Sequence, residues 1–237
     1  MTRGQSGLLL AGILWPNLAV WLYFVDLSAG LYVVCKLVQF ALPFVAITVF
    51  ASPRDWTLQI TRRETMAGAL SGLAIALGLI LLFEFALKDL GFVGEAKSRI
   101  ADKLNQLNLT DARSYLALAL GISFAHSFLE ELYWRGWIHE TLQRRSPLTL
   151  NQARWLSTLA FTGHHIVVIS QYAPNENRWA LTALFSAFVL AGGWIWAWWL
   201  DRERRGLKPS NLWAVWLSHI AADLAIFAIG WRLLQLG

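Results

Sequence analysis

The chain alternates between long apolar stretches and short polar segments. Seven such stretches cover 7–25, 31–51, 67–87, 114–136, 153–172, 179–200 and 211–231. The core of a bilayer is about 30 Å thick, so a helix needs roughly 20 apolar residues to cross it. Each stretch is therefore predicted to be a transmembrane helix, and together they fill well over half of the chain.

Two polar segments change this picture. No proline or turn signal follows the fourth stretch before Ser146-Pro147, so that helix is predicted to continue past Arg135 toward Gln143. In segment 88–113, apolar and basic residues recur at helical spacing, which predicts a helix lying on the membrane surface near 90–110.

The composition excludes an ordinary water-soluble domain. Hydrophobic residues make up 57% of the chain and charged residues 15%, against about 45–50% and 25% in soluble domains. A single cysteine, Cys35, excludes an intramolecular disulfide framework and a cysteine-rich metal cluster. We expect an all-α, polytopic integral membrane bundle in which residues 1–237 form one transmembrane domain.

The distribution of basic residues predicts an orientation. With the N-terminus inside, eleven of the 20 Lys and Arg residues fall on the inner side, seven on the outer side and two within spans. The positive-inside rule favours this arrangement. We expect the protein in a prokaryotic cytoplasmic membrane, and the net charge of +5 requires no nucleic-acid partner.

Ionisable groups at membrane depth are candidate functional residues, because an unpaired charge there is costly. Four of them lie near span ends, where a side chain reaches the interface, and are expected to be structural: Asp26, Lys36, Glu84 and Lys88. Three deeper groups remain.

The first deep group is the run from Glu130 to Arg135 in the fourth span. Glu131 and Arg135 are four residues apart on one helix face, so an ion pair is predicted. Glu130 points about 100° away and does not share that partner.

The other two deep groups contain histidine. His164 and His165 are adjacent in the fifth span, and we expect at most one of them to face a common site. His219 and Asp223 are four residues apart in the seventh span, so the carboxylate is positioned to orient the imidazole. Glu130, His165 and His219 all fall in the inner half of the bilayer, which predicts one polar cavity.

Such a cavity suits hydrolysis by activated water. A carboxylate near an imidazole acts as a general base, and a second imidazole donates to the oxyanion. The sequence contains neither a G-x-S-x-G elbow nor an H-E-x-x-H zinc motif. No cofactor is favoured, but a zinc ion held by Glu130, His165 and His219 stays an alternative.

Three short motifs occur in order on successive spans: Glu130-Glu131-x-x-x-Arg135, Phe161-x-x-x-His165 and His219-x-x-x-Asp223. In this arrangement the chain resembles the CAAX protease and bacteriocin-processing family of intramembrane glutamic-type proteases, related to the Ras-converting CAAX endopeptidases. The resemblance places the protease core at about residues 113–234.

The resemblance implies roles for these residues. Glu130 would activate water with the help of His165, and His219 and Asp223 would line the oxyanion side. Three residues would support the site: Glu131, Arg135 and Phe161. His164 and His126 are outside the motifs and are expected either to support the site indirectly or to be structural.

The expected substrate is a membrane-anchored protein or peptide, cleaved near a membrane-inserted or lipidated C-terminal tail. Whether that tail is prenylated, a sorting signal or a bacteriocin peptide stays open. The alternatives are a non-catalytic immunity or peptide-binding protein of the same fold, and a proton-relaying transporter. The latter would predict inverted repeats, which the sequence does not show.

Overall fold

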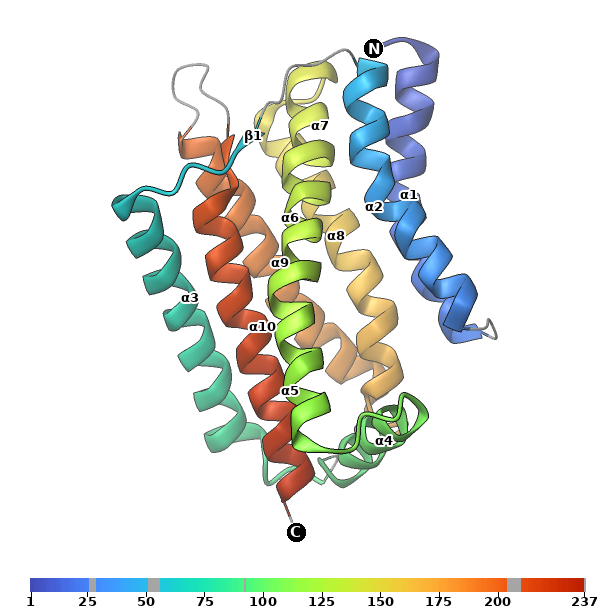
Figure 1. Ribbon diagram of the computed structural model, residues 1–237, viewed down its shortest axis with the longest axis vertical. Coiled ribbons are helices and arrows are strands. Elements are labelled where there is room, and N and C mark those ends of the chain that lie inside the picture. The colour runs from blue at the N-terminus through green and yellow to red at the C-terminus, as the bar shows by residue number, and fades with distance from the viewer. Residues whose placement is uncertain (26–28, 51–55, 92, 204–209, 237) are drawn as a thin grey trace. The chain divides into compact units, whose positions relative to one another are not determined.

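The computed structural model describes residues 1–25, 29–50, 56–91, 93–203 and 210–236 (Figure 1). These residues are almost entirely helical, as predicted. The helices are α1 (Arg3–Val25), α2 (Ala29–Phe50), α3 (Arg62–Leu82), η1 (Phe83–Leu87), α4 (Val93–Gln106), α5 (Ala112–Leu120), η2 (Gly121–His126), α6 (Ser127–Tyr133), η3 (Trp134–His139), α7 (Glu140–Arg145), α8 (Leu150–Tyr172), α9 (Arg178–Glu203) and α10 (Leu212–Gln235). Two two-residue strands, β1 (Trp56–Thr57) and β2 (Ser210–Asn211), pair in parallel.

Each of the seven predicted spans coincides with helical structure. Among the described residues, four segments are long and apolar enough to cross a membrane: Arg3–Leu22, Arg62–Leu87, Arg178–Asp201 and Leu212–Gln235. The protein therefore has the character of a helical membrane protein. The total of seven spans and the inward N-terminus stay predictions. Helix α4 forms where an interfacial helix was expected, and its place on the membrane surface also stays a prediction.

The described residues form two compact units. The first comprises Met1–Leu58, Leu129–Gln171 and Trp179–Leu212, and the second comprises Gln59–Phe128, Tyr172–Arg178 and Trp213–Gly237. The single transmembrane domain expected from the sequence stays a prediction.

In the first unit, small residues let helices approach closely. Helices α1 and α2 lie side by side as the blue ribbons of Figure 1, and the Trp15 indole donates to the Cys35 carbonyl at 3.0 Å. The Tyr133 hydroxyl donates to the Gly12 carbonyl at 2.6 Å. A Cβ at Gly12 would overlap the Trp137 ring, so only glycine fits at this contact between α1 and η3.

A buried polar network also joins helices of the first unit. The Asp201 carboxylate on α9 accepts hydrogen bonds from Gln143 Nε2 and from Arg154 Nε, both at 2.8 Å. His139 Nε2 lies 2.9 Å from the same carboxylate, and His139 Nδ1 lies 3.1 Å from Ser157 Oγ. A single carboxylate thus connects η3, α7, α8 and α9. The sequence pattern did not predict this network, because its members are far apart in the chain.

In the second unit, α3 packs against α10 through glycine. A Cβ at Gly68 would lie 2.5 Å from the Ala214 carbonyl oxygen. The Trp213 indole donates to Thr65 Oγ1 at 2.8 Å, and the Tyr115 hydroxyl of α5 donates to the Phe227 carbonyl at 2.7 Å. These polar contacts across helices hold the second unit together.

Helix α5, which leads into the first motif, begins at a capping residue. The Asp111 carboxylate accepts hydrogen bonds from the backbone N–H groups of Arg113 at 2.9 Å and Ser114 at 3.1 Å. These bonds and the one from the Ser114 side chain favour the ionised form, so the pKa of Asp111 lies below its ordinary value.

We predict that Asp201→Ala destabilises the protein. Removing the carboxylate leaves Arg154 and His139 buried without their anion, which costs about 3–5 kcal/mol for a buried pair. Thermal unfolding of the purified protein in detergent measures the effect as a lower midpoint. The exposed Asp89 supplies the control, and Asp89→Ala should leave the midpoint unchanged. Equal midpoints in the two variants would contradict the assigned role of the network.

Candidate active site

Helix α6 carries the adjacent acids and lies between two π-helices. η2 precedes it, η3 follows it, and helical structure then continues through α7 to Arg145. The predicted continuation of the helix past Arg135 is confirmed. π-helical turns are wider than α-turns, change the angle between successive side chains and occur frequently at functional sites. The sequence pattern did not predict these π-helices.

The predicted ion pair between Glu131 and Arg135 is present. Arg135 Nη1 lies 3.1 Å from Glu131 Oε1, and the two side chains are 3% and 0% exposed. The guanidinium carbon lies 4.2 Å from the centre of the Phe161 ring, and Nη2 reaches the Gly193 carbonyl at 3.5 Å. Arg135 thus joins the helix of the first motif to α8 and α9.

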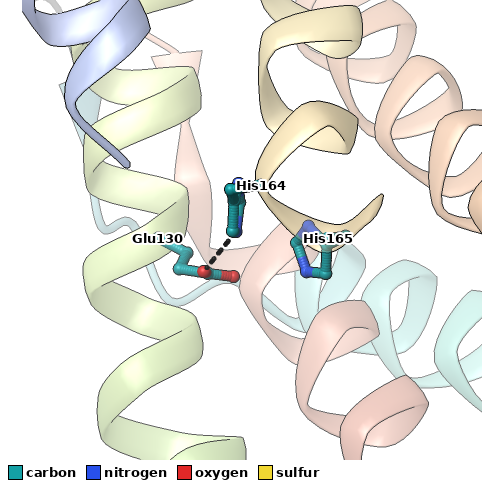
Figure 2. A group of neighbouring side chains, drawn as sticks. All are labelled: Glu130, His164 and His165. Atoms are coloured by element: carbon teal, nitrogen blue, oxygen red, sulfur yellow. Dashed lines mark hydrogen bonds and ion pairs between the residues drawn. The ribbon is translucent and has the colours of Figure 1, made fainter. Parts of the chain in front are cut away.

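Glu130 pairs with a different residue from the one that the motif indicated. His164 Nε2 lies 3.2 Å from Glu130 Oε1, and both side chains are almost completely buried (Figure 2). His164, which lies outside the three motifs, is thus in direct contact with Glu130. Two adjacent histidines in an apolar span were the available signal, and the family motif directed attention to the second of them.

His165 lies beside the same carboxylate. One ligand atom from each of Glu130, His164 and His165 falls within 4.8 Å of the others, and the two imidazole centres are 4.0 Å apart. The expectation that at most one of the two histidines faces a common site is wrong. The Cα–Cβ bonds of the two residues point about 100° apart around the helix axis. The two imidazole rings nevertheless approach each other, because both side chains are long enough to turn toward the same side.

Aromatic rings hold the two imidazoles. The His164 ring is stacked on Trp134, with centres 5.6 Å apart and planes 4° apart. Phe161 contacts His164 edge-on at 5.5 Å and His165 at 4.6 Å. Phe161 itself is buried. This frame restricts the orientations of both imidazoles.

Two of the four groups expected near span ends pair with each other. Lys88 Nζ lies 3.3 Å from Glu84 Oε2, and both side chains are about one-third exposed. Lys36, by contrast, is only partly exposed and acts electrostatically on Glu130 and His164. The charge of Lys36 therefore acts on the site, although Lys36 was expected to be a structural residue near a span end. Asp26 lies outside the described residues.

The third motif belongs to the second unit. His219 Nε2 and Asp223 Oδ1 are 3.6 Å apart on α10, and His219 is buried. This separation is an ion-pair distance, slightly longer than a hydrogen bond. The predicted His–Asp contact is thus present. The meeting of His219 with Glu130 and His165 in one cavity stays a prediction.

The fold and the cluster define a class: a helical membrane protein with an acid–imidazole cluster buried in its interior. Residues 112–225 match the family model described as type II CAAX prenyl endopeptidase, Rce1-like. The chain is similar to this family of CAAX-type proteases over that segment, which contains all three motifs, and the predicted resemblance is confirmed. Neither the comparison with curated proteins nor that with solved structures found a match.

We predict that Arg135→Ala lowers the stability of the fold. The substitution leaves Glu131 as an uncompensated buried charge, and breaking such a pair costs about 3–5 kcal/mol. The expected results are a lower yield of folded protein and a lower unfolding midpoint in detergent.

Lys88→Ala is the matched control, because Lys88 pairs with a glutamate at the same spacing but is partly exposed. Partly exposed pairs contribute roughly 0–1 kcal/mol. Wild-type stability of Arg135→Ala would contradict a stabilising role of the buried pair.

Proposed function

We propose that the protein is an intramembrane endopeptidase that cleaves near the membrane-inserted or lipidated C-terminal tail of a protein substrate. The observation that carries the proposal is the buried contact between Glu130 and His164, within the segment that matches the CAAX protease family. A carboxylate next to an imidazole, away from bulk water, is suited to acid–base chemistry on a bound water molecule.

In the proposed reaction, Glu130 is the general base. It takes a proton from water while the water oxygen bonds to the scissile carbonyl carbon. The C–N bond then breaks, and Glu130 returns the proton to the amine, which leaves a carboxylic acid and a free amine as products. The Glu131–Arg135 pair supports this step, because Arg135 is already bound to Glu131 and leaves Glu130 to act as the base.

The histidines have distinct proposed roles. His164 is placed to hold the Glu130 carboxylate and exchange a proton with it. His165 assists water activation, in keeping with the family motif. His219 donates a hydrogen bond to the oxyanion that forms on the carbonyl, and Asp223 orients its ring. We propose that the reaction needs no cofactor.

The proposed substrate is a membrane-anchored protein. The family model is named for prenyl endopeptidases, and four helices among the described residues are long and apolar enough to cross a membrane. A tail that is itself apolar, either through a lipid or through a single span, enters such a bundle without crossing water. We propose a prokaryotic cytoplasmic membrane with the N-terminus inside, as the basic residues predict.

We predict that Glu130→Gln abolishes proteolysis while leaving the fold intact. The amide keeps the size of the side chain but does not take up a proton, so the expected loss of rate is at least about 10²–10⁴-fold. The measurement compares C-termini in the membrane proteomes of cells that express the wild type and the variant. Glu84→Gln, the same change in a partly exposed glutamate, is the control and should retain activity.

If the same shortened C-termini appear with Glu130→Gln, Glu130 is not the catalytic base. If the wild type shortens no C-terminus where it is expressed and folded, the protein is the non-catalytic peptide-binding alternative.

We also predict that His164 contributes to turnover. His164→Asn should lower kcat by about 10²-fold with little change in KM, because its partner is Glu130 and not the substrate. Ser170→Ala is the control on the same helix, since that hydroxyl donates only to a carbonyl of α8. If His164→Asn keeps the wild-type kcat while His165→Asn loses most of it, then His164 does not contribute to turnover and only the motif residue His165 does.

A further inference from the structure

The cluster of Glu130, His164 and His165 has the donor set of a transition-metal site. It offers one carboxylate oxygen and two imidazole nitrogens within 4.8 Å of one another. Zinc binds such ligands at about 2.0–2.1 Å, which places neighbouring ligand atoms of a tetrahedral site roughly 3.4 Å apart. The observed 3.2 Å between His164 Nε2 and Glu130 Oε1 matches that spacing, so only His165 has to approach (Figure 2).

The hydrogen bond of His165 favours metal binding. Its Nδ1 lies 2.9 Å from the Phe161 carbonyl oxygen, and a carbonyl only accepts, so Nδ1 carries the proton. In the neutral ring this leaves a lone pair on Nε2. A backbone carbonyl that orients the far nitrogen is the usual outer partner of a metal-bound histidine.

His164 presents the same lone pair when its proton moves from Nε2 to Nδ1. The contact of Nε2 with Glu130 is then replaced by the bond to the metal. The proton on Nδ1, which is buried and has no hydrogen-bond partner among the described residues, opposes binding. The stacked Trp134 and the edge of Phe161 already hold the ring in place. Binding a metal therefore requires little additional ordering.

The charges around the cluster set a limit on its affinity. Glu131 is neutralised by Arg135, so Glu130 supplies the negative charge of the ligand set. Lys36 acts electrostatically on both Glu130 and His164, and its ammonium repels a cation. The site therefore has an opposing charge that can be removed by mutation.

We propose that Glu130, His164 and His165 bind a divalent metal ion of the zinc class, and that this ion inhibits the protease. The claim that the metal binds depends on the geometry alone, whereas the claim that it inhibits rests on the proposed function. A metal ion bound to the Glu130 carboxylate draws electron density from it and lowers its affinity for a proton, so the occupied site loses its general base. This ligand set contains His164 in place of the His219 expected from the sequence.

The test for binding uses cobalt as a spectroscopic probe. The chelator-washed, full-length protein in detergent is titrated with Co²⁺, whose visible absorption is intense in tetrahedral sites, and Zn²⁺ is then added to displace it. We expect one equivalent to bind, His164→Asn to weaken binding at least tenfold, and Lys36→Met to strengthen it. His219→Asn should bind cobalt as the wild type does. No saturable signal, or a loss of binding in His219→Asn, would overturn this ligand set.

The test for inhibition separates this inference from the proposed function. Chelator-washed wild type should cleave its substrate, and one equivalent of Zn²⁺ should stop cleavage. Cleavage that is insensitive to bound Zn²⁺ would overturn the inhibition and leave the protease assignment intact. Cobalt binding without cleavage under any metal condition would overturn the protease assignment and leave the metal site intact. Activity that depends on added Zn²⁺ would overturn both inhibition and metal-free hydrolysis.

Discussion

The buried ion pair between Glu131 and Arg135 is the interaction on which the rest of the site depends. Neither charge is stable in an apolar bundle without the other. Arg135 also lies over the Phe161 ring and reaches the Gly193 carbonyl, so the pair sets the rotation of its helix against α8 and α9. With Arg135 bound to Glu131, the adjacent Glu130 faces the imidazoles. One acid thus stabilises the helix, and its neighbour is available for chemistry.

A second buried network acts on the same helical segment. Asp201 binds Gln143 and Arg154 and lies next to His139. These contacts connect η3 and α7 to α8 and α9 at a second place, separate from the contacts of Arg135. The π-helices η2 and η3 lie on either side of the acids, and their wider turns change which side chains share a face. Two polar anchors fix the resulting geometry, because a buried polar group without a partner is unfavourable.

The contact between Glu130 and His164 changes how the family motif applies to this chain. The motif names His165, but that ring is bound through Nδ1 to the Phe161 carbonyl, and the direct partner of the carboxylate is the residue before it. Having two imidazoles beside one carboxylate supports two opposite uses of the cluster. In the proposed reaction, Glu130 acts as a base without a metal. In the proposed metal site, the same side chains become ligands and the base is lost.

The sequence by itself determined the features that depend on local spacing. Apolar stretches of sufficient length predicted the helices, the four-residue spacing of Glu131 and Arg135 predicted their ion pair, and three ordered motifs predicted the family. The tertiary structure alone decided which side chains meet across helices, among them His164 with Glu130 and Asp201 with Arg154. The physical reason is that helical periodicity specifies the face on which a residue lies, whereas its partner depends on how distant helices pack.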